Sequence, residues 1–255
     1  MLENTFIHLP DFGTRRERRL WESGISSWDD FLGRFGGSPY HKMHCTAIAS
    51  SKYALTNNKP EFFGPLLPSN ETWRAYPHFK KIAYVDIETT GLAPETDYMT
   101  VVGLYNGKRV HSYIHGQNLD DFARDISDYE LIVTFNGSVF DLPFIRKSFK
   151  GLKLPKLHID LRFLLASLNV TGGLKKIEQK FGMEREDDLK GMTGYDAVLL
   201  WQAYKKKNDG AALDKLIRYN AADICNLEKL LEWAYKEKRL GTGFDELIQK
   251  QKRKK

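Results

Sequence analysis

Alternating apolar and polar positions are clearest in the middle of the chain, where they predict short β-strands. Residues 82–88 begin as the apolar run Ile-Ala-Tyr-Val and end in Asp-Ile-Glu. The segment "YMTVVGLYNGKRVHSYIHG" predicts a hairpin, in which Asn106 and Gly107 supply the positive φ angles of a type I′ turn. The segment "ELIVTFNG" predicts another buried strand, and "LHIDLRFLLASL" predicts a short strand that continues into a helix.

Apolar residues at helical spacing fill the segments between and after these strands. They occur in "NLDDFARDISDY", in "SVFDLPFIRKSF" and in most of residues 173–238. The predicted order is three strands in a meander, followed by helix, strand, helix, strand and further helices. This order predicts an α/β fold in which a mixed sheet is flanked by helices.

The first third of the chain has a different pattern. Thr14 and Glu17 fit a capping box at the start of one short helix, and Ser27 can cap a second. Two helices joined at a glycine can bind phosphate groups, but Asp29 and Asp30 at the start of the second helix would repel them. We therefore expect packing or protein docking here rather than DNA binding.

These patterns divide the chain into three parts. Residues 33–78 are rich in Gly, Pro, Ser and Asn, which predicts loops and a connector. We expect residues 1–78 to form an N-terminal helical and connector segment and residues 79–240 to form the α/β domain. Residues 241–255 are expected to form a basic C-terminal tail.

Composition narrows the class of protein. Of the 255 residues, 42% are hydrophobic and 13% are aromatic, which is enough for a substantial core. No run approaches the roughly 18 apolar residues of a membrane helix, and the first residues lack the apolar stretch of a secretory signal. Cys45 and Cys225 are too few for a disulfide framework. These features predict a cytoplasmic protein with no membrane partner.

The net charge of +6 is concentrated at one end of the chain. The last six residues, "KQKRKK", carry most of this excess and leave only about +1 for the rest of the chain. A short basic tail more often adds solubility than it provides a specific binding element, although it can contact a phosphate backbone. The charge alone therefore does not make the body of the chain a nucleic-acid-binding surface.

Asp86 and Glu88 end the first predicted strand with two carboxylates on the same side. Side chains alternate along a strand, so both acids point to one face, where like charges repel each other and resist burial. A divalent cation turns this repulsion into coordination, and magnesium prefers oxygen ligands. The pair therefore predicts a metal site to which other elements add further acids.

Two other segments offer those acids. Asp141 falls in the first turn of a helix that follows a strand, where sites gather in open α/β sheets. Tyr219 and Asp223 are four residues apart on one face of an amphipathic helix. Each of these residues alone is more often part of a turn, a helix terminus or a helix surface. Their joint order and spacing favour one shared site.

Such a site has a definite chemistry. Four carboxylates, from Asp86, Glu88, Asp141 and Asp223, can hold two divalent ions for in-line displacement at phosphorus. Tyr219 can orient the attacking water and help to remove its proton, although a phenol with an ordinary pKa of about 10 is a weak base.

Three segments together resemble a known family. "DIETTGL" resembles the first motif of the DEDD-type 3′–5′ exonucleases, and "NGSVFDLPF" resembles the second motif in its family B polymerase form. "YNAAD" matches the Tyr-x-x-x-Asp third motif of the tyrosine subclass, and Arg218 stands where the histidine subclass has its histidine. The motif spacing, "HID" at residues 158–160 and "LWESGISSWDDF" are similar to the YprB-like proteins with a ribonuclease H fold. The motif-bearing resemblance covers about residues 79–238.

The resemblance implies a ribonuclease H-like mixed five-stranded sheet and a role for each motif residue. Two divalent ions, Mg²⁺ or Mn²⁺, are expected on the metal ligands Asp86, Glu88, Asp141 and Asp223. Tyr219 is expected to position the nucleophilic water. The terminal nucleotide is expected to contact Thr89, Thr90, Gly91, Leu92, Asn136 and Phe140. His158 and Asp160 are expected near the same cleft.

The resulting hypothesis is a 3′–5′ exonuclease that releases nucleoside 5′-monophosphates from single-stranded nucleic acid, with DNA slightly preferred over RNA. The ions, stacking on aromatic residues and the lysines Lys175, Lys176 and Lys180 would hold the strand. Two alternatives stay open: an RNA-processing exoribonuclease on the same fold, and a catalytically inactive nucleic-acid-binding module. Protein partners stay unknown from the sequence.

Overall fold

The structure is a computed structural model of the chain and describes residues 1–76 and 78–253. The chain divides into two compact units. The first unit contains three separate stretches of sequence, Met1–Lys80, Lys156–His158 and Trp233–Lys255. The second unit contains Lys81–Pro155 and Ile159–Glu232. The second unit carries the predicted acidic residues, so its architecture decides whether they meet.

A mixed sheet of five strands forms the centre of the fold. The strands are β1 (Ile82–Thr89), β2 (Met99–Tyr105), β3 (Val110–Ile114), β4 (Leu131–Thr134) and β5 (Leu157–Asp160). Their order in the sheet is β3-β2-β1-β4-β5. Strand β1 is antiparallel to β2 and parallel to β4, and β2 is antiparallel to β3. The mixed five-stranded sheet confirms the predicted fold class and places β1 in the middle.

Helices account for most of the remaining chain. The α-helices are α1 (Thr14–Glu22), α2 (Trp28–Phe35), α3 (Lys42–Thr56), α4 (Asp121–Asp125), α5 (Asp141–Ser148), α6 (Leu161–Ala166), α7 (Leu174–Lys180), α8 (Gly194–Lys207), α9 (Gly210–Cys225), α10 (Leu227–Gly241) and α11 (Phe244–Lys252). Short 3₁₀ helices are η1 (Leu2–Asn4), η2 (Pro39–His41), η3 (Pro60–Phe62), η4 (Ser69–Ala75), η5 (Ile126–Asp128) and η6 (Asp187–Leu189). None of the helices in the described ranges combines the length and the apolar content that a membrane span requires.

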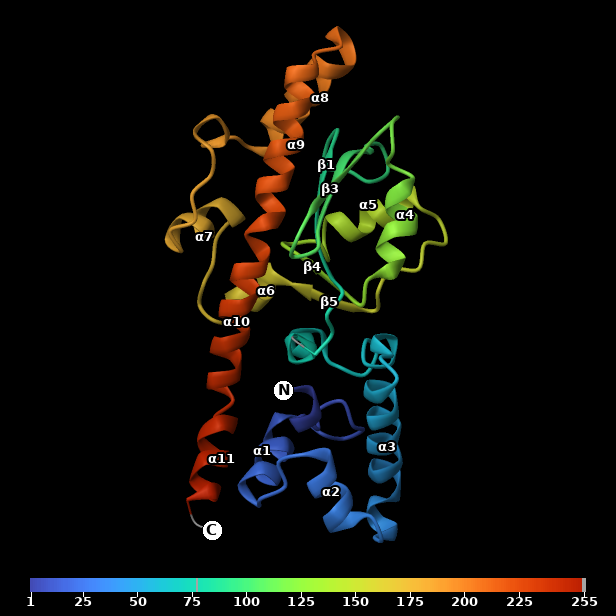
Figure 1. The fold of residues 1–255 in the computed structure, drawn as a ribbon, viewed down its shortest axis with the longest axis vertical. Helices are drawn as coiled ribbons and strands as arrows, with labels where there is room; N and C mark the ends of the chain where they lie inside the picture. Colours follow the sequence, from blue (N-terminus) through green and yellow to red (C-terminus); the bar gives the residue numbers. More distant parts are fainter. Residues whose placement is uncertain (77, 254–255) are drawn as a thin grey trace. The chain divides into compact units, whose positions relative to one another are not determined.

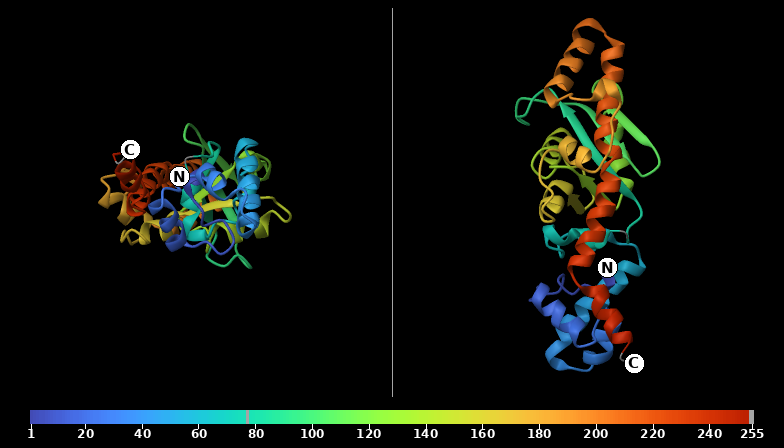
Figure 2. Two further views of the ribbon diagram at one scale, coloured as in Figure 1. Left: turned by 90° about the horizontal axis from the view of Figure 1, so that it is seen from below. Right: turned by 90° about the vertical axis from the view of Figure 1, so that its left-hand side faces the viewer.

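Helices cover both faces of the sheet (Figure 1), and two further views follow the same elements (Figure 2). On one face, Val85 of β1 packs in a core with Phe122 of α4 and Phe144 of α5. On the other face, the core includes Trp201 of α8 and Leu216 of α9. Because side chains alternate along a strand, the even-numbered residues of β1 point to the face that α8 and α9 cover. The acids of β1 therefore face α9.

The two helices at the start of the chain begin differently. Ser27 caps α2 as predicted: its Oγ accepts from the Asp30 N–H at 3.1 Å, and the Asp30 carboxylate accepts from the Ser27 N–H at 2.9 Å. The capping box predicted at Thr14 is wrong, because α1 has no side-chain cap. Glu17 is instead buried, where its carboxylate pairs with Arg74 at 3.1 Å. A buried ion pair thus replaces the expected surface cap.

The expectation of loops throughout residues 33–78 is wrong, because α3 spans fifteen of them. The buried side of α3 consists only of Ile48, Ser51 and Ala54. Such a narrow side, with a serine at its centre, lacks the wide apolar stripe that predicts a helix. The sequence pattern therefore does not reveal this helix.

Part of the expected basic C-terminal tail is helical, because α11 spans Phe244–Lys252. The Phe244 ring of α11 packs against Trp21, with 4.9 Å between the ring centroids. Gln251 Nε2 donates to the Trp21 carbonyl at 2.6 Å. The expected tail also includes residues 254 and 255, which lie outside the described residues.

The hairpin between β2 and β3 is confirmed, but its turn differs from the predicted one. Gly107 has a positive φ of 83°, whereas Asn106 is not among the described residues with positive φ. Asn106 Oδ1 instead accepts from the N–H groups of Lys108 and Arg109 at 3.0 and 2.9 Å. The Asn106 N–H also donates to the Arg109 carbonyl at 3.2 Å, so the two-residue turn consists of Gly107 and Lys108, one position later than predicted.

Candidate metal centre and active site

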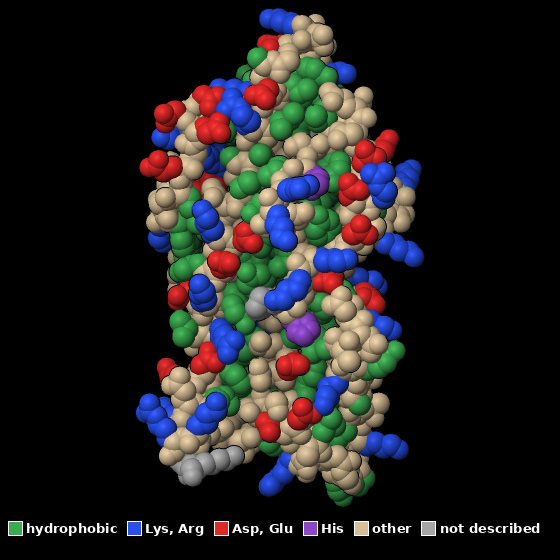
Figure 3. All heavy atoms as spheres, in the orientation of Figure 1, with side chains coloured by type: hydrophobic (Ala, Val, Ile, Leu, Met, Phe, Trp, Pro, Cys, Tyr) green, Lys and Arg blue, Asp and Glu red, His purple; other side chains and the backbone are tan. Residues whose placement is uncertain are grey.

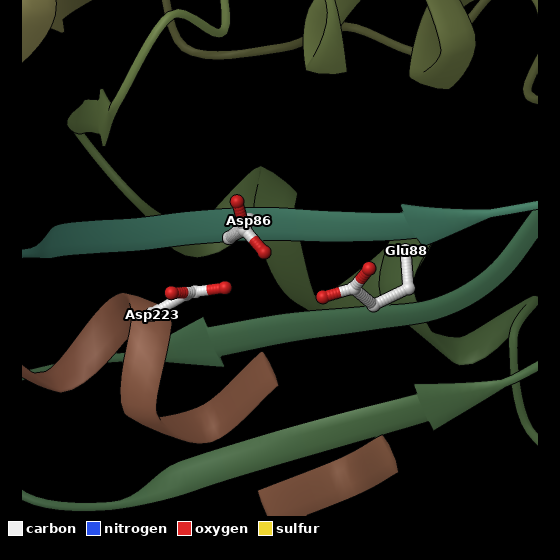
Figure 4. A group of neighbouring side chains, drawn as sticks. All are labelled: Asp86, Glu88 and Asp223. Carbon is white, nitrogen blue, oxygen red and sulfur yellow. The ribbon is translucent and has the colours of Figure 1, made fainter. Parts of the chain in front are cut away.

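Strand β1 and helix α9 bring three acidic side chains together. In the sheet register, Asp86 lies opposite Gly103 of β2, and Glu88 lies opposite Val101. Asp86, Glu88 and Asp223 of α9 each offer one carboxylate oxygen, and these oxygens lie within 4.8 Å of one another. Figure 4 shows the three side chains gathered beside β1, with Asp223 reaching them from its helix. The structure thus places three of the four predicted acids in one cluster.

Helix α9 adds an amide that the sequence pattern does not indicate. Asn220 Nδ2 donates to Asp86 Oδ2 at 2.9 Å and to the Asp86 carbonyl at 3.2 Å. A Cβ atom at Gly103 would lie only 2.1 Å from Asn220 Oδ1, so this approach requires glycine in the facing strand. Asn220 therefore fixes the orientation of the Asp86 carboxylate.

Asp141, the fourth predicted acid, lies beside this cluster. It is the first residue of α5 and is almost completely buried, with 2% of its surface exposed. Its Oδ1 accepts from the Ile87 N–H at 3.2 Å. Ile87 separates Asp86 from Glu88 in β1, so the Asp141 carboxylate contacts the same stretch of strand. A backbone hydrogen bond thus places Asp141 at the edge of the cluster.

Asp160 and Asn136, both expected near the cleft, build the turn that precedes α5. Asp160 accepts from the N–H groups of Asn136 and Ser138 at 2.8 and 3.0 Å. Asn136 has a positive φ of 69°, and its Oδ1 accepts from Arg162 at 2.7 Å. These contacts give both residues a role in aiming α5 and its Asp141. His158 belongs to the first unit.

Burial and mutual repulsion raise the pKa values of the acids at the centre. For Asp86 and Glu88, burial is the largest cause of the raised pKa, and the negative charge of Asp223 is the next. Burial also raises the pKa of Asp141 to about 7. Burial raises the pKa of Asp223, while the nearby Arg185 guanidinium opposes this change. Carboxylates removed from water in this way are stabilised by a positive charge among them.

Two cationic side chains reach this group of acids. Arg185 Nη2 lies 2.5 Å from Asp223 Oδ1 and also pairs with Glu178 of α7. Lys175 Nζ donates to the Tyr219 hydroxyl at 2.5 Å. Arg185 has no sequence signature, because it lies in an irregular segment outside any periodic pattern. Glu178 lies in α7, and no motif marks it. Lys175, which is expected to hold substrate, contacts the predicted catalytic tyrosine.

Tyr219 is held in its protonated form. Burial raises the pKa of the Tyr219 phenol, and the negative charges of Asp223 and Glu88 raise it further. The phenol therefore keeps its proton at neutral pH. With Lys175 donating to its oxygen, Tyr219 can donate its own hydrogen to a third group. This geometry favours a role in orienting a water molecule over a role as a base.

A cavity of about 720 Å³ opens at this cluster. Among the predicted residues, it is lined by Asp86, Glu88, Thr89, Thr90, Gly91, Leu92, Phe140, Tyr219 and Asp223. Asn136 is not among its lining residues. The opposite wall comes from α8, which contributes Tyr195, Val198 and Gln202. The sequence pattern does not reveal this wall, since an exposed tyrosine on a helix resembles ordinary surface.

The donor set fits a divalent cation. It consists of carboxylate oxygens, which Mg²⁺ and Mn²⁺ prefer as ligands. Its acids are buried close together and have pKa values raised by one another, so they gain free energy from a cation that neutralises them. Asp86, Glu88 and Asp223 are the residues placed to bind it.

A mixed α/β sheet whose central strand and covering helix share an acidic cluster defines a ribonuclease H-like protein. Residues 83–235 match the family model of the RNase_H superfamily. The match covers more than half of the chain, and the protein belongs to the RNase_H superfamily. A search of curated proteins finds no match.

Several solved structures are similar to this chain. The family B DNA polymerase of the hyperthermophilic archaeon Pyrobaculum calidifontis is 17% identical, with a TM-score of 0.47. The similarity covers 62% of this chain but only 24% of the polymerase. Brucella melitensis NrnC with bound Mg²⁺ is 21% identical over 71% of this chain and 86% of NrnC, with a TM-score of 0.45. NrnC bound to pGG is 22% identical over 71% and 85%, with a TM-score of 0.44.

Proposed function

We propose that the protein is a metal-dependent 3′–5′ exonuclease of the DEDD type and its tyrosine subclass. It hydrolyses phosphodiester bonds at the 3′ end of a single strand and releases nucleoside 5′-monophosphates. The supporting observation is the convergence of Asp86, Glu88 and Asp223 at one cavity that Tyr219 also lines. The YprB-like proteins are the proposed family within the superfamily, because the motif spacing, "HID" at residues 158–160 and "LWESGISSWDDF" are similar to theirs.

Asp86, Glu88, Asp141 and Asp223 are the proposed ligands of two divalent ions, Mg²⁺ or Mn²⁺. When bound, such ions supply a water of lowered pKa and stabilise the charge on the leaving oxygen. Asn220 keeps the Asp86 carboxylate in position through its 2.9 Å hydrogen bond. Asp141 is buried against β1, which leaves its carboxylate little freedom to move.

Tyr219 is proposed to orient the attacking water. Its hydroxyl accepts from Lys175 at 2.5 Å and keeps its own hydrogen, because its pKa is raised. A donor fixed in this way holds the oxygen of a water molecule in line with the phosphorus. Proton removal then passes to another acceptor, since a protonated phenol cannot take a second proton at neutral pH.

The cavity walls support an unpaired terminal nucleotide as the ligand. Leu92 is exposed at the rim and Phe140 lies in the wall, so a flat base can contact both. On the face shown in Figure 3, Lys and Arg side chains alternate with Asp and Glu and form no continuous basic strip. This favours a short single strand over a long duplex. We also propose that DNA is slightly preferred over RNA and that the protein is cytoplasmic.

The test uses matched DNA and RNA oligonucleotides labelled at either the 3′ or the 5′ end, incubated with Mg²⁺ or Mn²⁺. We expect stepwise shortening from the 3′ end, release of 5′-monophosphates and a loss of at least about 10³-fold in rate for Asp223→Asn. Asp187→Asn is the matched control, because Asp187 is an exposed acid paired only with Lys190.

Three results would contradict parts of the proposal. Equal rates for the wild type and Asp223→Asn would remove the carboxylate cluster from the reaction. Faster shortening of RNA than of DNA would favour the exoribonuclease alternative. Binding of the oligonucleotide without cleavage under either metal would favour an inactive nucleic-acid-binding module.

A further inference from the structure

Arg185 forms an ion pair with the carboxylate of Asp223, which the proposed function assigns as a metal ligand. Its Nη2 lies 2.5 Å from Asp223 Oδ1. Only 6% of the Arg185 side chain and 11% of the Asp223 side chain are exposed, so little water screens this pair. A guanidinium and a divalent cation repel each other strongly at contact distance, and the repulsion is greater where water is scarce. One oxygen of Asp223 therefore cannot serve both at once.

Arg185 has a second anchor that does not depend on Asp223. Its Nε donates to Glu178 Oε2 at 2.7 Å, and Glu178 is almost completely buried in α7. Glu178 Oε1 in turn accepts from Asn226 at 3.0 Å. The anchor keeps the guanidinium close to the centre even when its contact with Asp223 is broken.

The surroundings also give the guanidinium room to turn. Arg185 and Glu178 line a second cavity of about 550 Å³, together with Glu184 and Lys175. In the described part of the chain, Arg185 Nη1 is buried without a hydrogen-bond partner. A shift toward the acids of this cavity would satisfy that nitrogen, which is costly to leave unpaired.

We propose that Arg185 is a positioning residue that holds the Asp223 carboxylate before metal binds, and that a divalent ion binds by displacing the Arg185 guanidinium from Asp223. This inference rests on the proposed function and adds to it the residue that sets metal affinity. When no metal is bound, the contact gives each of these two buried charges a partner of opposite sign. It also weakens metal binding, because the ion has to break the contact.

Opposite effects of two substitutions separate this role from a merely structural one. Arg185→Gln removes the competitor and tightens metal binding. Glu178→Gln leaves Asp223 as the main anionic partner of Arg185, strengthens their contact and weakens metal binding. If the Arg185–Glu178 pair only supported the local structure, both substitutions would weaken metal binding.

The experiment is a calorimetric titration of the full chain with Mn²⁺ at one pH, without nucleic acid. We expect Arg185→Gln to bind Mn²⁺ about tenfold more tightly than the wild type, and Glu178→Gln to bind it several-fold more weakly. Arg218→Gln is the matched control. Arg218 precedes Tyr219 in α9, but its guanidinium pairs with Glu186, Asp188 and Asp214 and not with the cluster.

A second variant covers the case in which Arg185→Gln fails to fold, which circular dichroism would show. The double variant Arg185→Gln with Glu178→Gln removes one positive and one negative buried charge, so the net charge near the centre is unchanged. We expect it to bind Mn²⁺ more tightly than the wild type, because only the direct competition has been removed.

The outcomes distinguish this inference from the proposed function. Tighter binding by Arg185→Gln or the double variant, with Arg218→Gln unchanged, supports the inference, even if the wild type binds too weakly to measure. Wild-type binding of Mn²⁺ with unchanged or weaker binding by the Arg185→Gln and double variants overturns the inference alone. An equal gain in Arg218→Gln also overturns it, since the effect would then be general. Absence of Mn²⁺ binding in every variant overturns both proposals.

Discussion

Three side chains at the acidic centre are each restrained by a partner outside the acidic group. Asn220 orients Asp86, the Ile87 N–H holds Asp141, and Lys175 fixes the Tyr219 hydroxyl. These contacts come from the chain's own residues, so they orient Asp86, Asp141 and Tyr219 without help from a cation. Preorganisation of this kind lowers the cost of assembling a reactive geometry.

Replacement of Tyr219 tests the role of one hydroxyl. Tyr219→Phe keeps the buried ring and removes the group that Lys175 contacts. We expect Mn²⁺ affinity to stay within about twofold of the wild type, while the single-turnover rate falls by about 10²-fold because the water loses its orienting donor. Tyr204→Phe is the control, since the Tyr204 hydroxyl contacts Gln117 and does not line the cavity. An unchanged rate would remove Tyr219 from the mechanism.

The raised pKa of Asp141 predicts how stability depends on pH. Its folded-state pKa is about 7, against an ordinary value of 3.8. The folded chain thus binds this proton more tightly than the unfolded chain. The resulting stabilisation is complete below about pH 4 and is lost as the pH rises through about 7.

The measurement is urea unfolding in EDTA at pH 5 and pH 8. We expect Asp141→Asn to reduce the loss of stability between these values by up to about 3 kcal/mol, because asparagine does not titrate. Saturating Mn²⁺ should oppose the wild-type loss, since the metal binds the deprotonated carboxylates. Equal pH dependence in the wild type and Asp141→Asn would contradict the assignment.

At the scale of elements, the packing of α9 on β2 depends on one glycine. A Cβ at residue 103 would meet Asn220 Oδ1 at 2.1 Å and Ile224 Cδ1 at 3.0 Å. We expect Gly103→Ala to lower the free energy of unfolding by about 1–3 kcal/mol and to reduce the proposed nuclease activity, because Asn220 moves away from Asp86. Thermal unfolding and rate measurements test both effects.

A double-mutant cycle gives the control for Gly103→Ala. Asn220→Ala removes the nearest obstacle, so adding Gly103→Ala to it should cost at least about 1 kcal/mol less than in the wild type. Additive costs would show that the glycine is needed for another reason.

Helix α8 contributes to the wall of the cavity that Leu92 and Phe140 also line. Thr193 and Asp196 fix the start of α8 through a capping box, and Tyr195 in its first turn is 70% exposed while lining the cavity. Its ring is therefore available to stack on a base. Tyr195→Ala should raise KM about tenfold and change kcat little, because stacking contributes about 1–3 kcal/mol per base.

Two substitutions on α8 serve as controls for this prediction. Tyr195→Phe keeps the ring and should behave as the wild type. Leu199→Ala removes an exposed side chain of the same helix that does not line the cavity. If Leu199→Ala raised KM as much as Tyr195→Ala, the effect would not come from stacking in the cavity.

The sequence predicts a helix or strand correctly where the spacing of its apolar residues matches the period of that element. The apolar runs of β1 and β4 and the two-residue spacing of Asp86 and Glu88 follow directly from strand geometry. Helix α3 escapes prediction because its buried side is narrow and partly polar. Arg185 escapes prediction because its contact with Asp223 joins an irregular segment to a helix, and no spacing rule describes such a contact.

At the scale of the whole molecule, each of the two compact units consists of two or three separate stretches of sequence. The sequence pattern changes near residue 79, which suggests a domain boundary there. The first unit also takes Lys156–His158 and Trp233–Lys255 from the later chain. These stretches are contiguous in sequence with elements of the α/β sheet, so composition and periodicity cannot assign them to the first unit.

This division predicts how fragments of the chain behave. A fragment of residues 79–255 keeps the C-terminal stretch of the first unit but loses its partners. It exposes Phe244, which packs on Trp21, and Tyr235, whose ring lies 5.9 Å from Trp73. Exposed apolar patches of this kind favour association. A fragment of residues 79–232 ends before these side chains and should remain monomeric.

The two fragments can be compared by size-exclusion chromatography, binding of a hydrophobic dye and titration with Mn²⁺. We expect fragment 79–255 to associate and bind dye. Fragment 79–232 should elute as a monomer and retain Mn²⁺ binding, because Asp86, Glu88 and Asp223 all lie in the second unit. Association of both fragments to the same extent would contradict the assignment of residues 233–255 to the first unit. Loss of Mn²⁺ binding in a folded fragment 79–232 would show that the metal centre needs residues outside that fragment.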